Sequence, residues 1–312
     1  MGNSIREAYG KHIAKLGGEY EDLVLLEGDL ADSTQSEHFQ KAFPDRYLQI
    51  GIAEQNMVGI AAGLALEGKI PIVNSFAAFI SMRACEQVRT DVAYPNLNVK
   101  FVVSHAGVSA GSAGPTHHTI EDIAIMRAIP NIMVFVPGDT IELEQIINAA
   151  LDHIGPVYIR LSAIDVEDVY DNVNRFVIGK ATQLRDGNDA TIITTGTLMY
   201  EGTCAADILR ADHGTNIRLL QMASVKPIDV DAIIKAADET GLIITIEEHN
   251  IIGGLGGAVS EVVAENGKGQ VRRLGINDCF CETAGSPGYL MKEQGLTIDE
   301  IVTQIKFLLN IK

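Results

Sequence analysis

Short apolar runs alternate along the chain with longer stretches whose apolar residues recur at helical spacing. In the first half, five runs are typical of buried strands: residues 23–27, 70–74, 99–104, 132–137 and 157–161. Helical spacing is found around residues 54–67, 78–93, 120–128 and 140–152. This alternation is typical of a parallel sheet with helices on both faces, in which ligands bind beyond the carboxyl ends of the strands.

The same pattern restarts after an acidic, turn-rich stretch at residues 162–176. Four more apolar runs follow it, at residues 190–196, 217–222, 242–248 and 271–276. We therefore predict an α/β chain of two doubly wound α/β domains. The predicted domains are residues 1–165, with a parallel sheet, and residues 179–312, joined by a linker at 166–178.

Composition and charge narrow the class of protein. The chain has 312 residues, of which 46% are hydrophobic, and a formal net charge of -17. This length suits two domains, and the acidic excess argues against nucleic acid as a partner. No apolar run is long enough to span a bilayer, and the charged first residues do not form a signal peptide. The four cysteines form no CxxC pair, so we expect packed thiols in a reducing cytoplasm. From the charge and the apolar runs we expect neither nucleic acid nor a membrane as a partner.

Glu54 is the first candidate for chemistry. It heads a small-residue apolar helix in "QIGIAEQNMVGIAAGLAL", residues 49–66. The helix dipole alone favours a carboxylate in the first turn, so a capping role is one interpretation. However, the flanking residues offer no basic partner within one helical turn, and the small residues imply close packing against another backbone. A carboxyl group in such a place is either costly or functional.

Three ordered segments resemble a known family. They are "GIAEQNMVGIAAGLALEG" (51–68), "SFAAFISMRACEQVR" (75–89) and "SHAGVSAGSAGPTHHTIEDIAIMRAIPNIMVFVPGD" (104–139). Together they resemble the pyrimidine-binding domain of transketolase, in the form in which the enzyme is split between two genes. The match runs from Arg6 to about Arg160. Residues 246–261, "IEEHNIIGGLGGAVSE", are similar to the family's carboxyl-terminal domain.

The resemblance implies a site for thiamine diphosphate. Glu54 matches the acid that bonds to the pyrimidine N1′ and so promotes the imino tautomer that removes the thiazolium proton. Phe79 matches the aromatic that stacks on the pyrimidine, with Phe76 and Met82 at neighbouring positions and Asp29 near the cofactor. Met82 replaces an aromatic and implies a looser wall. Without the family, Phe76 and Phe79 read as a core stripe and Asp29 as a strand-end cap.

The resemblance also implies a substrate site. His117, in "GPTHH", matches the histidine that bonds to the substrate carbonyl or hydroxyl and moves protons. A phosphate-binding set is implied for Arg6, Ser33, His105 and Arg160, although each alone reads as a surface or capping group. Ala113 stands where transketolases carry an aspartate that recognises a hydroxyl group of the sugar. The resemblance with this change implies an unusual or branched sugar phosphate as the substrate.

The sequence lacks the Gly-Asp-Gly motif with which the family holds Mg²⁺ and the diphosphate, so no metal ligand is assigned to this chain. The resemblance implies a partner subunit, equivalent to the amino-terminal half, that carries this site in a heterotetramer of two plus two chains. The expected activity is the transfer of a two-carbon ketol unit between sugar phosphates. Three alternatives stay open: the beta subunit of a 2-oxo-acid dehydrogenase, half of a deoxyxylulose-phosphate synthase, and a silent scaffold.

Overall fold

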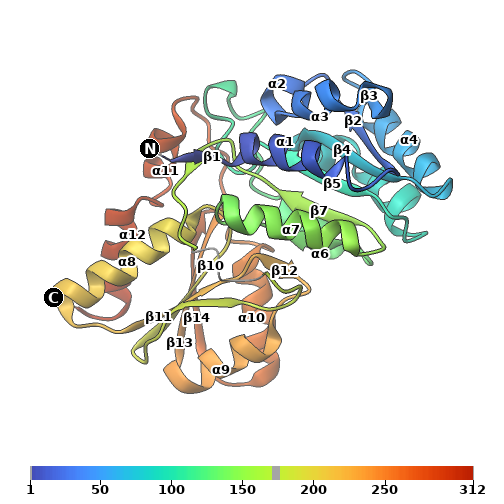
Figure 1. The fold of residues 1–312 in the computed structure, drawn as a ribbon. Helices are drawn as coiled ribbons and strands as arrows, with labels where there is room; N and C mark the ends of the chain where they lie inside the picture. The colour runs from blue at the N-terminus through green and yellow to red at the C-terminus, as the bar shows by residue number, and fades with distance from the viewer. Residues whose placement is uncertain (1, 171–175, 312) are drawn as a thin grey trace.

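The computed structural model describes residues 2–170 and 176–311, so part of the predicted linker lies outside the described residues. The chain forms a seven-stranded sheet and a five-stranded sheet, stacked one above the other in Figure 1. A two-stranded ribbon pairs β1 (Asn3–Ser4) with β8 (Asp165–Val166). Parallel strands predominate in both large sheets, which confirms the predicted α/β class.

The seven-stranded sheet is built mainly from the first half of the chain. Its order is β12 (Ser224–Lys226), β6 (Met133–Phe135), β7 (Val157–Arg160), β5 (Lys100–Ser104), β4 (Ile70–Phe76), β2 (Leu23–Glu27) and β3 (Tyr47–Gln49). All neighbours are parallel except β12, which runs antiparallel to β6. The edge strand β12 comes from the second half of the chain, so the two halves share one sheet.

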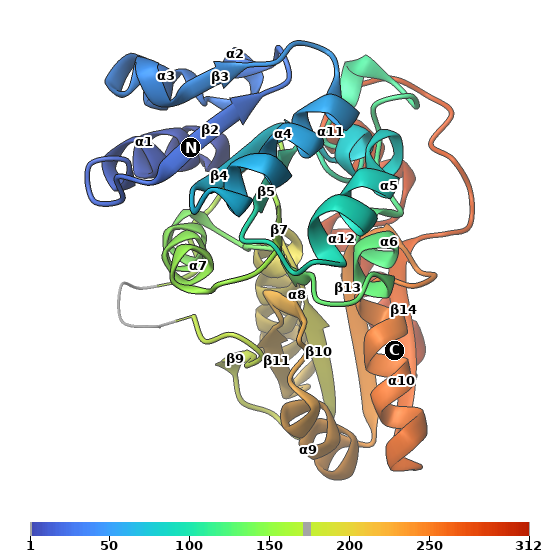
Figure 2. The same ribbon diagram turned by 90° about the vertical axis from the view of Figure 1, so that its right-hand side faces the viewer.

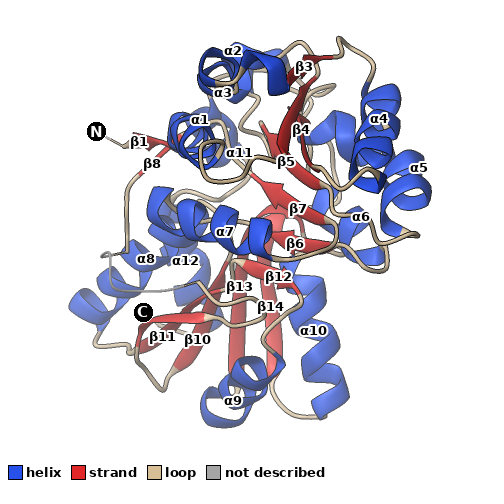
Figure 3. Cartoon of the chain, turned by 45° about the vertical axis from the view of Figure 1, so that its right-hand side comes forward, coloured by secondary structure: helices blue, strands red, loops and turns tan. Residues whose placement is uncertain are grey.

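Helices cover both faces of this sheet. The helical elements of the first half are α1 (Ile5–Leu16), α2 (Ala31–Thr34), α3 (Glu37–Ala42), η1 (Pro44–Arg46), α4 (Glu54–Leu66), η2 (Phe79–Arg83), α5 (Cys85–Gln87), η3 (Val88–Ala93), η4 (Gly111–Ala113), α6 (Asp122–Ala128) and α7 (Thr140–Asp152). Helices α1 and α7 pack on one face, and α4 and α6 lie on the other (Figure 3). The two apolar cores that result leave the strand ends free to carry loops.

The predicted helix at residues 78–93 is interrupted in the structure. Phe79–Arg83 and Val88–Ala93 are π-helical, and a short α-helical turn separates them. Wide turns of this kind are rare and occur often at functional sites. A π-helical turn has a different spacing between side chains on one face from that of an α-helix. The apolar spacing of the sequence, which was compared with that of an α-helix, therefore did not reveal these turns.

The five-stranded sheet belongs to the second half. Its order is β14 (Gln270–Ile276), β13 (Leu242–Asn250), β10 (Ala190–Thr194), β11 (Ile217–Gln221) and β9 (Thr182–Arg185), with β9 antiparallel. Its helices are α8 (Leu198–His213), α9 (Val230–Thr240), α10 (Leu255–Asn266), α11 (Pro287–Glu293) and α12 (Ile298–Leu308). Helices α8 and α12 pack on one face, while α9 and α10 cover the other (Figure 2).

All nine predicted strands are present, whereas β1, β3, β8, β9 and β12, of two to four residues each, were missed because so few residues show no pattern.

Among the described residues, no helix combines the length and apolar character needed to cross a membrane. The four cysteines are free; Cys281 is buried, but Cys279 is exposed, contrary to the expectation of packed thiols.

Candidate active site

The candidate site lies at the carboxyl ends of three adjacent parallel strands. β2, β4 and β5 end at Glu27, Phe76 and Ser104. The segments that follow these strands carry Asp29, Phe79 and His105, while the loop after His105 carries His117. This is the edge at which open α/β sheets bind ligands.

Glu54 begins α4 and is only 1% exposed. Its Oε2 accepts a hydrogen bond from Arg83 Nη1 at 2.8 Å, and its Oε1 lies 3.5 Å from Ser75 Oγ, the donor at the end of β4. The basic partner that the flanking sequence lacks is therefore supplied by Arg83, 29 residues further along the chain. The carboxylate is buried, as expected for a functional acid, but it is paired.

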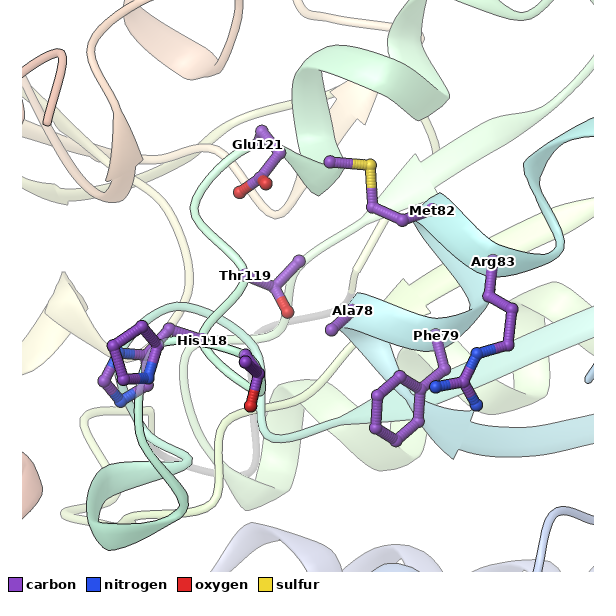
Figure 4. Close-up of a pocket in the computed structure, with 9 residues that line it drawn as sticks. Ala78, Phe79, Met82, Arg83, His118, Thr119 and Glu121 are labelled. Carbon is purple, nitrogen blue, oxygen red and sulfur yellow. The ribbon is translucent and has the colours of Figure 1, made fainter. Parts of the chain in front are cut away.

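Phe79 forms the centre of an aromatic stack. Its ring lies 5.7 Å from that of Phe76 with an interplanar angle of 16°, and the Arg83 guanidinium carbon lies 4.3 Å from the Phe79 ring centroid. Phe76 is buried, so the core-stripe interpretation holds for it, whereas Phe79 is partly exposed. Met82 is 53% exposed and lines the cavity described below (Figure 4).

Two histidines complete the stack. The His117 ring meets Phe79 edge-on at 5.4 Å, and the His105 ring stacks on Phe76 at 3.9 Å. Burial, together with the charges of Arg6 and His117, lowers the pKa of His105 to about 4. His105 is therefore neutral near pH 7 and can accept or donate one hydrogen bond there.

Arg6 and Ser33, two residues of the predicted phosphate set, are in contact. Arg6 Nη1 donates to the backbone oxygen of Ser33 at 2.8 Å, while Arg6 Nε is buried and has no hydrogen-bond partner among the described residues. An unpartnered buried donor is costly unless a ligand accepts from it. Arg6 Nε is therefore available to a ligand, and its role in binding phosphate stays a prediction.

Glu27 orders the loop that carries Asp29 and Ser33, and sequence reasoning missed it. Its buried carboxylate accepts hydrogen bonds from the backbone of Gly28 and Leu30 and the hydroxyls of Thr34 and Ser36. Asp29 is exposed and has φ 67°, a conformation held by this loop. The signal was present in the sequence as a single acid that ends an apolar run, "LVLLE".

Arg160, the fourth residue of the predicted phosphate set, is held in a buried ion pair. It is 5% exposed, and its Nε donates to both oxygens of Asp122 at 3.1 and 2.9 Å. Its Nη2 donates to the backbone oxygen of Glu248 on β13 at 3.0 Å. Asp122 on α6 and the backbone of β13 therefore engage the guanidinium, which leaves less of it for a phosphate group.

The glycine-rich segment at residues 246–261 packs tightly against this interface. Glu247 accepts hydrogen bonds from the backbone of Leu255 and Gly256 at the start of α10, at 2.6 and 2.8 Å. A Cβ atom at Gly254 would collide with the Glu247 side chain. The glycines therefore serve a close turn between β13 and α10.

A cavity of about 460 Å³ opens beside the stack (Figure 4). Phe79, Met82 and Arg83 line one side, and His118 and Thr119 line the other. His118 Nδ1 and Thr119 Oγ1 are buried and, within the described part of the chain, have no hydrogen-bond partner. An aromatic ring and unsatisfied polar atoms line this cavity, and the buried Glu54 is hydrogen-bonded to Arg83 in its wall. This set of groups fits the pyrimidine part of thiamine diphosphate. No group of three or more His, Cys, Asp or Glu that could hold a metal ion occurs among the described residues.

Comparison with known proteins gives matches over nearly the whole chain. Residues 2–167 match the pyrimidine-binding domain of transketolase, and residues 179–301 match the transketolase carboxyl-terminal domain. A putative transketolase carboxyl-terminal section of Methanocaldococcus jannaschii is 46% identical over 304 residues, which cover 96% of this chain and 95% of that protein.

Two further relatives are similarly complete. The 6-deoxy-6-sulfo-D-fructose transketolase subunit of a Clostridium species is 41% identical, over 96% of this chain and 92% of that protein. A solved structure described as a split-gene transketolase, an inactive beta4 tetramer, is 42% identical to this chain and has a TM-score of 0.89. The match covers 100% of both chains. The chain therefore belongs to the transketolase family, and the three relatives described above, which it covers almost from end to end, are named as a transketolase carboxyl-terminal section, a transketolase subunit and a split-gene transketolase.

Proposed function

We propose that this chain is one subunit of a thiamine diphosphate-dependent transketolase that transfers a two-carbon ketol unit between sugar phosphates. The observation that carries the proposal is the buried Glu54 carboxylate and the half-buried Phe79 ring, which both contact Arg83. A carboxyl group next to an aromatic platform suits an aminopyrimidine ring, which needs both a hydrogen-bond partner and a stacking surface. Bound thiamine diphosphate supplies a nucleophilic carbon and an electron sink for cleavage of the carbon–carbon bond.

The residues of this chain have separate roles in the proposal. Glu54 holds a proton at the pyrimidine N1′, and Phe79 fixes the ring, with Phe76 and Met82 completing the wall. His117, edge-on to Phe79, moves a proton at the substrate carbonyl or hydroxyl. Asp29 remains assigned near the cofactor, on the loop that Glu27 orders.

The anionic end of the substrate is assigned to Arg6, Ser33 and the neutral His105. The unpartnered Nε of Arg6 supports this assignment. Arg160 is left out because Asp122 and the Glu248 backbone engage its guanidinium. One guanidinium instead of two gives a less strongly charged site. Together with the exposed Ala113 in η4, this arrangement supports a substrate other than the usual sugar phosphates, and one relative is named for a sulfonated sugar.

The diphosphate and Mg²⁺ are assigned to a partner subunit equivalent to the amino-terminal half of transketolase, because this sequence lacks the Gly-Asp-Gly motif. We propose that two copies of each chain form a cytoplasmic heterotetramer that is active only when assembled. The relative described as an inactive beta4 tetramer supports the need for a second kind of chain. The domain matches support units at residues 1–165 and 179–312 with a linker at 166–178, although β12 crosses between the sheets.

The proposal is tested by co-expressing the chain with the product of the adjacent open reading frame. The purified complex is assayed with Mg²⁺, thiamine diphosphate, a panel of ketose phosphates and an aldose phosphate acceptor. We expect ketol transfer that requires both chains. Turnover of a 2-oxo acid instead, or full activity of this chain alone, would overturn the proposal.

A further inference from the structure

Arg83 makes both contacts that the proposed site reserves for a pyrimidine ring. The Phe79 ring stacks with that of Phe76 at 5.7 Å, and the Arg83 guanidinium lies over the Phe79 ring, with its central carbon 4.3 Å from the ring centroid. The same guanidinium donates from Nη1 to Glu54 Oε2 at 2.8 Å. One planar, nitrogen-bearing group thus stacks on the aromatic and bonds to the buried acid.

These contacts exclude a cofactor ring from the same place. Stacked aromatic rings lie roughly 4.5–7 Å apart between centroids, so no second ring fits between Phe79 and a guanidinium at 4.3 Å. A pyrimidine that stacks on Phe79 and bonds to Glu54 must therefore displace Arg83 from both.

The position of Arg83 allows that displacement. Its side chain is 45% exposed, and it is the last residue of the π-helical segment Phe79–Arg83. It also lines the cavity of about 460 Å³, into which the guanidinium can swing while Phe79 and Glu54 stay in place (Figure 4). Arg83 is half-exposed, whereas its partner Glu54 is buried. Solvent screening on the arginine side and the weak cation–π contact limit the competition to about tenfold, which a bound cofactor can overcome.

We propose that Arg83 takes the place of the pyrimidine in the free chain. There it occupies the cofactor site, and binding of the cofactor displaces it. The inference rests on the proposed function, because it takes Glu54 and Phe79 as the pyrimidine contacts. Its consequence is that the isolated subunit keeps its buried carboxylate paired and its aromatic face covered. The lone chain consequently binds the vitamin poorly.

The test uses isothermal titration of thiamine into the full chain, since thiamine lacks the diphosphate assigned to the partner. Arg83→Ala is expected to bind thiamine about tenfold more tightly than the wild type, because the two competing contacts are lost. Arg83→Met, which keeps the apolar stem, is expected to behave in the same way. Arg89→Ala removes the same charge from an exposed position in the neighbouring π-helical segment and is expected to bind like the wild type.

The outcomes separate the two proposals. If both Arg83 variants, with unchanged melting temperatures, bind no more tightly than the wild type, or if none of the chains binds, the substitute role is wrong. Phe79→Ala and Glu54→Gln, each added to Arg83→Ala, are expected to abolish the gain. If thiamine diphosphate binding by the assembled complex is indifferent to Phe79 and Glu54, the site itself, and with it the proposed function, is wrong.

Discussion

Replacement of Arg160 by methionine tests whether this residue fastens the two sheets or binds substrate. Arg160 and Asp122 are 5% and 0% exposed, and Asp122 also accepts from Tyr158 OH at 2.9 Å. Methionine fills much of the arginine volume but donates no hydrogen bond. Arg160→Met therefore leaves a buried carboxylate with a single neutral donor and a Glu248 backbone oxygen without its partner.

The expected loss follows from these contacts. Breaking a buried ion pair by removal of one member costs about 3–5 kcal/mol, because the remaining charge stays uncompensated. We expect the free energy of unfolding of the full chain to fall by that amount. Asp122→Asn added to Arg160→Met removes the charge and is expected to restore part of the loss.

The assay is chemical denaturation of the full chain, read by far-ultraviolet circular dichroism. The matched control is Arg185→Met, which breaks a surface pair with Asp207 at 39% and 52% exposure. It is expected to cost less than about 1 kcal/mol. If Arg160→Met leaves unfolding unchanged and raises only the KM of the assembled enzyme for a sugar phosphate, Arg160 is a substrate ligand and our reasoning is refuted.

Further predictions concern the acid, the pH dependence and the glycines. Glu54→Gln is expected to lower kcat of the assembled complex by about 100-fold or more, whereas a silent scaffold would show no change in turnover. Burial raises the pKa of Glu201 to about 7, so the stability that its neutral form contributes is present below the usual value of 4.5 and is lost as the pH rises through 7. Glu201→Gln is therefore expected to raise the melting temperature at pH 8 but not at pH 4.5, and an equal rise at both would contradict the assignment. Gly107→Ala, at φ 66° and in collision with Glu248, is expected to cost about 2–4 kcal/mol of unfolding free energy. Gly59→Ala in α4, where a Cβ meets nothing within 4 Å, is expected to stabilise the free chain by about 0.5–1 kcal/mol in the same denaturation assay.

The central strands of both sheets were predictable because they are buried on both faces. Leu23–Glu27 and Ala190–Thr194 read as continuous apolar runs and end where the pattern ends. The edge strands were not predictable in the same way, since β3 and β12 have three residues each and face fewer neighbours. Their pairing depends on the sheet already present beside them.

The site was predictable only where local sequence carries the signal. Glu54 and Phe79 stand in motifs that a family resemblance picks out. The pairing of Glu54 with Arg83 depends on how a π-helical turn aims a side chain, which no residue spacing reports. Arg160 shows the opposite limit, because a residue in a matching segment was given a role that its burial and its partners do not support.

The antiparallel strand β12 has a practical consequence for any attempt to dissect the protein. A fragment that stops in the linker would lack Ser224–Lys226 and leave β6 with a row of unsatisfied amide and carbonyl groups. Such an unpaired edge strand can pair with the same strand of another copy, which leads to aggregation. A soluble fragment with the cofactor-binding part alone would therefore need either a grafted edge strand in place of β12 or charged residues along β6.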